Sequence, residues 1–173
     1  DIGMRYSIHG IVDATDIARV SELSGLSEQR CKELIDYLSV HTDVVPKDDD
    51  DELEALDYAL ASLAIEVAVT RHAGHLEQYY SPMGISYMQI GKDLTAVKTV
   101  IVTGGALIHT KRTAQIASHA LFNPLDAFSL KPKEAQVLVD RKYILAAMGI
   151  LSTEYPQTAL RIMKKELVKD GNH

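Results

Sequence analysis

The chain has 173 residues, of which 46% are hydrophobic and 24% are charged, and its formal net charge at pH 7 is −6. These values fit a globular protein large enough for one compact domain, and the negative charge argues against a nucleic-acid partner held by its phosphates. The single cysteine, Cys31, excludes an internal disulfide, and no apolar run reaches the roughly 20 residues of a membrane-spanning helix. The sequence therefore predicts a cytoplasmic protein that does not contact a membrane.

The first part of the chain predicts helices. Apolar residues at helical spacing indicate one helix over residues 13–24, ended by Gly25, and a second over residues 27–40. A third helix, the longest, is predicted from about residue 52 to residue 79. The first twelve residues are too mixed in composition to be assigned to a helix, strand or loop.

Two polar clusters flank the long predicted helix. The acidic run over residues 47–52 lacks the spacing of a calcium-binding loop, so we interpret it as the acidic start of a helix, where the helix dipole favours negative charge. His72 and His75 lie three residues apart, but no third ligand is evident and the helical pattern of zinc enzymes is missing. We therefore expect no metal site in either cluster.

The second part of the chain predicts strands that alternate with helices. Apolar and aromatic runs on both sides of residues 82–84 predict a hairpin with a three-residue turn. Two short apolar strands are predicted at residues 98–103 and 135–140. Helices are expected after them, at residues 110–121 and 143–151.

A last helix, opened by Pro156, has Leu160, Met163 and Leu167 as its expected buried stripe, with Lys164, Lys165 and Lys169 near its end. The order of elements predicts two parts, a helical subdomain at residues 1–76 and an α/β layer at residues 77–173. We expect the helices of the first part to be unable to bury their apolar faces alone and to pack on the layer.

The strand predicted at residues 98–103 ends in the segment Thr103-Gly104-Gly105-Ala106. A glycine turn between a buried strand and a helix brings backbone N–H groups up to a nucleotide, so this segment is a candidate nucleotide site. Lys92 and His109 lie close to it in sequence. We interpret Lys92 as a solvated turn residue and His109 as a helix-start histidine without a catalytic role.

An independent catalytic centre is the weakest reading of the sequence. Asp140 ends a predicted strand and is a candidate partner for a histidine, but the seven histidines show no recognised catalytic spacing. The Gly-x-Ser-x-Gly segment of the serine hydrolases is also missing. We therefore expect no catalytic residue in this chain.

Six short segments, spread over the chain, carry a resemblance to a known family. They are Asp1-Ile2-Gly3-Met4-Arg5, Arg71-His72-Ala73-Gly74, Pro82-Met83-Gly84, Gly91-Lys92-Asp93-Leu94, Thr103-Gly104-Gly105 and Asp140-Arg141-Lys142-Tyr143-Ile144-Leu145-Ala146-Ala147-Met148-Gly149. In this order they resemble the MutL family that accompanies glutamate mutase and ornithine aminomutase, which is unrelated to the mismatch-repair proteins of the same name. That family is similar to the sugar kinase, Hsp70 and actin ATPases.

The resemblance implies an α/β fold in which helix predominates, as part of a ribonuclease H-like lobe of an actin-like ATPase. It implies an ATP-dependent reactivating chaperone for an adenosylcobalamin-dependent aminomutase, with ATP or ADP and Mg as cofactors of the full-length protein. Residues 103–106 would form the adenosine motif. Where the family pattern is Gly-Thr-Gly-Gly, Val102 occupies the first position, which predicts crowding at the nucleotide.

The chain contains no segment like the Asp-Gly-Gly-Thr phosphate loop of these ATPases, and Asp1-Ile2-Gly3 lacks the Gly and Thr that would follow. Because the chain also begins without Met, we expect it to be a piece of a longer protein and to be unable to hydrolyse ATP alone. The alternative is a non-enzymatic helical module for interaction or assembly, without nucleotide binding. The sequence leaves open which mutase is the client and what the oligomeric state is.

Overall fold

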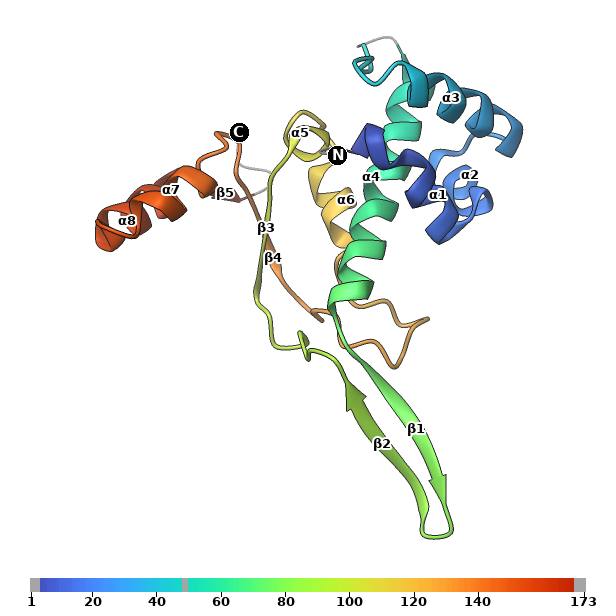
Figure 1. The fold of residues 1–173 in the computed structure, drawn as a ribbon, viewed down its shortest axis with the longest axis vertical. Coiled ribbons are helices and arrows are strands. Elements are labelled where there is room, and N and C mark those ends of the chain that lie inside the picture. The colour runs from blue at the N-terminus through green and yellow to red at the C-terminus, as the bar shows by residue number, and fades with distance from the viewer. Residues whose placement is uncertain (1–3, 48–49, 170–173) are drawn as a thin grey trace.

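The computed structural model describes residues 4–47 and 50–169. Its elements follow in the order η1 (Met4–Ser7), α1 (Ile8–Thr15), α2 (Ile17–Ser24), α3 (Glu28–Val40), α4 (Asp51–His72), β1 (His75–Ser81), β2 (Gly84–Ile90), β3 (Thr99–Val102), α5 (Gly105–Ile108), α6 (Thr113–Ser118), β4 (Gln136–Val139), α7 (Leu145–Leu151), α8 (Pro156–Glu166) and β5 (Val168–Lys169). Helices gather around α4, the hairpin β1–β2 projects away from them, and α6 lies between α4 and the strands β3 and β4 (Figure 1). The predicted class, α/β with a predominance of helix, is confirmed.

Helices α1 to α4 form a bundle that has a hydrophobic core of its own. Its buried residues are Ile8, Ile11, Val20, Cys31, Ile35, Leu38, Leu53, Leu56, Ala59, Leu60 and Leu63. Because α4 offers apolar side chains on successive turns, α1 and α2 both pack along it and α3 packs against them. This corrects the expectation that the first helices cannot bury their apolar faces without the α/β layer. The predicted division at residue 76 stays a prediction.

The start of the bundle departs from the predicted helix over residues 13–24. The structure has two helices there, α1 and α2, because Asp16 adopts a φ of +86° and ends α1. The Asp16 side chain then accepts a hydrogen bond from the Ala18 N–H and caps α2. The predicted stop is confirmed, since Gly25 has a left-handed backbone conformation with a φ of 73°. Residues left unassigned from the sequence form η1 and the first turn of α1, and Asp1 to Gly3 lie outside the described residues.

Helices α3 and α4 begin as predicted. The Ser27 hydroxyl accepts a hydrogen bond from the Arg30 N–H at 3.2 Å, and the Asp50 carboxylate accepts one from the Leu53 N–H at 3.1 Å. The acidic run therefore caps α4, as interpreted, although Asp48 and Asp49 lie outside the described residues. The prediction that this helix continues to residue 79 was wrong, because Ala73 is extended and the chain enters β1 at His75.

The predicted hairpin is present and longer than expected. Strands β1 and β2 pair antiparallel from His75 opposite Ile90 to Ser81 opposite Gly84, so the turn holds two residues rather than three. At its base the backbone crosses itself at Gly74, where a Cβ atom would lie 2.3 Å from the carbonyl oxygen of Ile90. Only glycine fits this crossing.

The second sheet has the order β3-β4-β5, with β3 parallel to β4 and β5 antiparallel to it. Both predicted strands are confirmed, whereas β5 was not predicted and Lys169 lies in it rather than at a helix end. The helix predicted over residues 110–121 is shorter, α6 at Thr113–Ser118, and a separate short helix, α5, precedes it at Gly105–Ile108. A second core joins this sheet to them through Val102, Ile108, Ala117 and Val139. Ile101 is 44% exposed, so β3 is buried on one face only.

Two groups of polar contacts connect the bundle to α6. The guanidinium carbon of Arg112 lies 3.2 Å from the centroid of the Tyr58 ring, a cation–π contact. Glu66 of α4 lies 3.2 Å from His119 Nδ1 and 3.7 Å from a guanidinium nitrogen of Arg19. Helices α7 and α8 pack against each other away from the bundle (Figure 1). Contrary to the predicted stripe, Leu160 of α8 is exposed and its neighbour Ala159 is buried.

Candidate functional site

The parallel strands β3 and β4 end side by side, since Val102 and Val139 form the last pair of their ladder. Each strand is followed by a polar turn, residues 103–106 after β3 and residues 140–144 after β4. In open α/β sheets, ligands bind in the crevice beyond the carboxyl ends of the parallel strands. The two turns therefore frame the candidate site, and the first of them holds all four site residues predicted from the sequence.

Gly104 and Gly105 form the tight passage from β3 into α5. Gly104 has a φ of +102°, a conformation that other residues rarely adopt, and its carbonyl accepts hydrogen bonds from the N–H groups of Leu107 and Ile108, both at 3.0 Å. Thr103, Gly105 and Ala106 are exposed. The predicted segment is thus an exposed glycine turn at a strand end.

Two aromatic rings flank Gly105. A Cβ atom on this glycine would lie 3.7 Å from the Tyr143 hydroxyl oxygen and 3.9 Å from His109 Cδ2. Both side chains are exposed. Sequence spacing gave no reason to place Tyr143 beside Gly105, because the two residues come from the separate turns after β3 and β4. Its position is the main feature of the site that the sequence reasoning missed.

Asp140 holds the second turn in place. Its side chain is buried, with Oδ1 accepting from the Ile144 N–H at 3.0 Å and Oδ2 accepting from the Leu145 N–H at 3.1 Å. Its own N–H donates to the Val102 carbonyl at 2.9 Å, which ties the end of β4 to the end of β3. The carboxylate therefore caps α7 and fixes the turn that carries Tyr143. Its partners are these backbone groups rather than a histidine, so the geometry gives no support to a catalytic Asp–His pair.

Arg141 adds a second connection between the two turns. Its Nη1 donates a hydrogen bond to the carbonyl oxygen of Ile108, the last residue of α5, at 3.1 Å. A cation at the carboxyl end of a helix interacts favourably with the helix dipole. This bond and the Asp140 contacts hold the glycine turn and the Tyr143 turn in a fixed relation.

Val102 occupies the position where the family pattern has its first glycine. Its side chain is 6% exposed and packs with Ile108, Ala117 and Val139 in the second core. It therefore points into the protein, on the side opposite to solvent, and needs no unusual backbone conformation. The valine supports the sheet beneath the turn.

The other polar residues singled out in the sequence lie elsewhere. Lys92 lies before β3 in the chain, whereas the glycine turn follows β3. The Nζ atom of Lys92 lies 3.5 Å from Nε2 of His72, near the base of the hairpin. His75 pairs instead with Glu77, at 3.3 Å. Within residues 4–47 and 50–169, no group of three or more His, Cys, Asp or Glu side chains is arranged to hold a metal ion.

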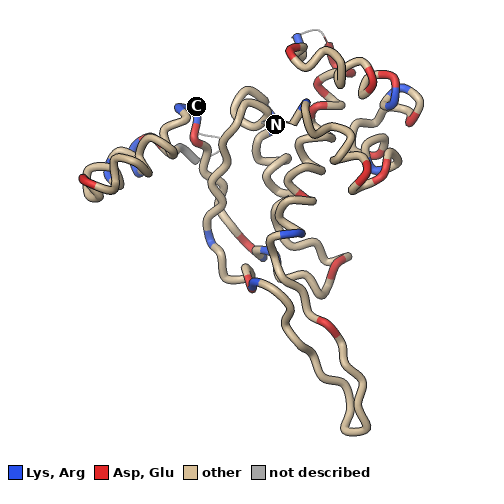
Figure 2. The backbone as a smooth tube through the Cα atoms, in the orientation of Figure 1, with Lys and Arg blue, Asp and Glu red and all other residues tan. Residues whose placement is uncertain are grey.

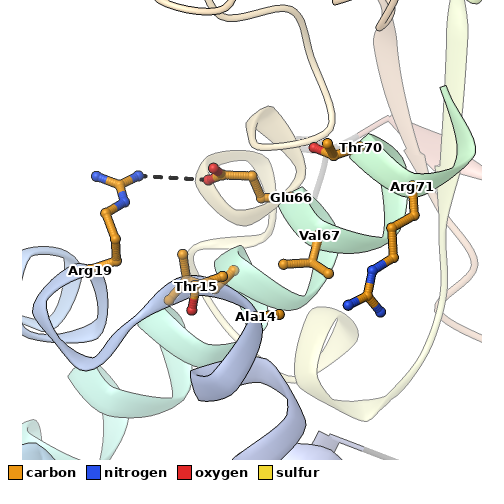
Figure 3. Close-up of a pocket in the computed structure, with 8 residues that line it drawn as sticks. Ala14, Thr15, Arg19, Glu66, Val67, Thr70 and Arg71 are labelled. Atoms are coloured by element: carbon orange, nitrogen blue, oxygen red, sulfur yellow. Dashed lines mark ion pairs between the residues drawn. The ribbon is translucent and has the colours of Figure 1, made fainter. Parts of the chain in front are cut away.

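The bundle contains two open clefts, both lined by residues of α1 and α4, that the sequence did not predict. The first, of about 360 Å³, is lined by residues of α1, α2 and α4, and the Arg19–Glu66 ion pair closes one side of it (Figure 3). The second, of about 540 Å³, lies between η1, α1 and α4. Both clefts share Val67 and Arg71, and neither includes a residue of the glycine turn.

A family model and a curated protein that match this chain both point to the same family. The MutL family, described as MutL protein, matches residues 1–167. Among curated proteins, Protein MutL of Clostridium tetanomorphum is 40% identical over 175 residues, covering 98% of this chain. The chain spans about a third of that relative's length, 36%. No solved structure matches. In the part of the chain that the structure describes, no helix is long and apolar enough to cross a membrane.

Proposed function

The chain belongs to the MutL family, and we therefore propose that it forms part of an ATP-dependent reactivating chaperone for an adenosylcobalamin-dependent aminomutase. In this proposal the client is glutamate mutase or ornithine mutase. The chain supplies the adenosine-binding side of the nucleotide site through Thr103, Gly104, Gly105 and Ala106, within a lobe of the actin-like ATPase type.

The exposed glycine turn at the carboxyl end of β3 is the observation that carries the nucleotide part of the proposal. At Gly105 the backbone is open to solvent, and no Cβ atom keeps a ribose or a phosphate from approaching it. The side chains of Tyr143 and His109 lie near this approach, and aromatic rings are suited to stack on a nucleobase. The turn and its neighbours therefore fit the adenosine end of ATP or ADP.

Phosphoryl transfer needs more than this surface. It depends on metal ions and on charged groups that position the phosphates and neutralise their charge. The described residues provide no metal-ligand cluster, so we assign binding of adenosine to this chain and derive no hydrolytic step from it. Mg would neutralise the phosphates when the nucleotide is bound to the complete protein.

A second candidate function is that of a non-enzymatic interaction module. The bundle α1–α4 has its own core, and its two clefts between α1 and α4 are open surfaces that nucleotide binding at Gly105 does not use. In this reading the glycine turn has a purely structural role at the start of α5. The two candidates differ in whether the protein binds nucleotide.

Isothermal titration calorimetry of the complete protein with ADP and with ATP plus Mg separates the two candidates. We expect binding by the wild type and a loss of affinity of about tenfold or more, roughly 1.4 kcal/mol, in Gly105→Val. The added Cβ meets no atom closer than 3.7 Å, so this variant should fold while its side chain covers the turn. Gly149→Ala, where an added Cβ meets nothing within 4 Å, is the matched control and should bind as the wild type does.

Two outcomes of the titrations would contradict the proposed nucleotide site. A folded wild type that gives no binding heat would favour the interaction module. Binding that is equal in Gly105→Val and in the wild type would place the nucleotide elsewhere. The client is tested separately, by adding the complete protein and ATP to an inactivated aminomutase and measuring whether the mutase regains activity.

A further inference from the structure

The hairpin β1–β2 projects from the rest of the chain (Figure 1). Every residue of β2 is exposed, and so is every residue of β1 except the partly buried Leu76. Several of the exposed side chains are large and apolar, including Tyr80 at 77%, Ile85 at 56% and Tyr87 at 56%. A two-stranded hairpin in water is at best marginally stable by itself, so a ribbon of this kind gains stability from a further surface.

The hairpin also carries no charge over most of its length. Charged residues make up 24% of the chain, yet none of the residues from 78 to 91 is Lys, Arg, Asp or Glu. Figure 2 shows this stretch in tan between the acidic Glu77 and the basic Lys92. Proteins usually protect free sheet edges with charged residues. An uncharged and apolar free edge is therefore typical of a strand that pairs with another chain.

The two edges of the hairpin differ. The outer edge of β1 is occupied near its base, where the Leu76 N–H donates to the Phe128 carbonyl at 2.8 Å and His75 pairs with Ser129. Within the described residues, β2 has no strand on its other side. In an antiparallel ladder, alternate residues point their backbone groups outward. Because Leu76 points outward and lies opposite Gln89, the outward residues of β2 are Ile85, Tyr87 and Gln89.

We propose that β2 pairs antiparallel with β2 of a second copy of this chain, so that two hairpins form one four-stranded sheet around a two-fold axis. The absence of charged residues in β2 favours a second copy of this chain as the partner. In a symmetric interface, residues near the axis meet their own copies, so any charge there would face the same charge. Strand β2 contains none, whereas the chain as a whole has a net charge of −6 and two copies repel each other elsewhere. Projection of the hairpin lets the copies pair while their acidic bodies stay apart.

The register that pairs all three outward residues has its two-fold axis at Tyr87. It places Tyr87 opposite its own copy and Ile85 opposite Gln89 of the second copy. Residues that exchange ladder hydrogen bonds in this way have Cα atoms about 5.5 Å apart. That separation lies within the range that a disulfide can span.

The oligomeric state of the full chain tests the pairing. We expect light scattering after size exclusion to show a dimer for the wild type and a loss of that dimer in Tyr87→Lys, which places two like charges opposite each other at the two-fold axis. Leu125→Lys is the matched control, because Leu125 is 94% exposed in the loop after α6 and lies outside the hairpin. It should stay dimeric. Circular dichroism of all three proteins shows whether each is folded.

Cysteine crosslinking tests the register. The native Cys31 is fully buried, so a cysteine introduced on the surface is the reactive thiol. Under mild oxidation we expect Tyr87→Cys to form a disulfide-linked dimer, and Leu125→Cys and the wild type to remain uncrosslinked. A wild type that stays monomeric at its highest soluble concentration would overturn the proposal. So would a dimer that persists in Tyr87→Lys, or a Tyr87→Cys variant that crosslinks no more than Leu125→Cys.

Discussion

The helical bundle and the β1–β2 hairpin meet at the end of α4 and are built in opposite ways. The bundle buries its apolar side chains against one another, and charged residues recur along its backbone (Figure 2). The hairpin buries none of its own side chains, leaves aromatic residues in solvent, and is anchored by a backbone crossing at Gly74. The comparison indicates that the bundle is stable through its own packing, whereas the hairpin depends on its base and on a partner.

The largest expected effect is the loss of a side chain from the bundle core. Leu60 is fully buried, and Leu60→Ala should lower the free energy of unfolding by roughly 4 kcal/mol, through lost apolar burial and the cavity left behind. Met83 at the hairpin turn is 99% exposed, and Met83→Ala should change the free energy of unfolding by less than about 0.5 kcal/mol. Urea denaturation followed by circular dichroism gives both values. Equal losses would contradict the comparison.

The half-buried carboxyl of Asp57, which is paired with Arg5 in the bundle, should make stability depend on pH. Arg5 Nη1 lies 2.7 Å from Asp57 Oδ1, and Nη2 donates to Oδ2 at 2.7 Å. Burial raises the pKa of Asp57 from 3.8 to about 6, although the positive charge of Arg5 opposes the shift. Because the folded protein then binds this proton more tightly than the unfolded chain does, the stabilisation is present below about pH 4 and is lost as the pH rises to about 6.

The free energy of unfolding should therefore fall by about 3 kcal/mol as the pH rises from about 4 to about 6. We expect Asp57→Asn to remove this part of the slope when the free energy of unfolding is measured by urea titration between pH 4 and pH 7. Glu77 on the hairpin is the matched control. A hydrogen bond from the Tyr79 hydroxyl lowers the pKa of this exposed carboxyl from 4.5, so its own effect lies near and below that pH, and Glu77→Gln should leave the slope above about pH 5 unchanged. A slope that survives in Asp57→Asn would show that another group causes it.

The hairpin base should be sensitive to a single methyl group. In Gly74→Ala the new Cβ would lie 2.3 Å from the Ile90 carbonyl oxygen and 2.8 Å from the Lys92 nitrogen, and the backbone would have to move. We expect a loss of about 2 kcal/mol, with the largest NMR shift changes in β1 and β2. Gly10→Ala in α1, where a Cβ meets nothing, should instead gain about 0.5 to 1 kcal/mol. A neutral Gly74→Ala would mean that the crossing does not anchor the hairpin.

The loss of one hydroxyl group from a helix cap in the bundle and from the hairpin turn should give the smallest difference in unfolding free energy between the two regions. Ser27→Ala removes the side-chain acceptor for the Arg30 N–H at the start of α3 and should cost about 1 kcal/mol of unfolding free energy. The Ser81 hydroxyl donates to the Gly84 carbonyl at 3.1 Å in the exposed hairpin turn, and Ser81→Ala should cost less than about 0.5 kcal/mol. Thermal unfolding of both variants ranks them. The reverse order would show that the turn, not the helix cap, limits stability.

Sequence periodicity predicted the bundle better than the rest of the fold. Helix α3 was placed correctly because Cys31, Ile35 and Leu38 recur at helical spacing, and all three are buried. The break at Asp16 was missed because a positive φ at a residue other than glycine depends on what packs around it. The end of α4 was missed for a similar reason, since the start of β1 is set by the crossing near Gly74 rather than by local propensity.

The candidate site was predicted in part. The glycine turn after β3 could be placed from a strand pattern followed by Gly104 and Gly105. The neighbouring ring of Tyr143 could not, because it arrives from a segment more than thirty residues away, brought close by the pairing of β3 with β4. Strand β5, two residues long, exists only through its pairing with β4 and has no periodicity of its own.

The most direct test of the account is to locate the nucleotide on the isotope-labelled protein by NMR during titration with ADP. The account predicts that the largest shift changes fall on the backbone amides of Gly104 and Gly105 and on Tyr143, while the bundle and the hairpin stay unchanged. Shift changes confined to the clefts beside α1, at Thr15 and Arg71 for example, would contradict it. So would a folded protein in which saturating ADP moves no signal at all.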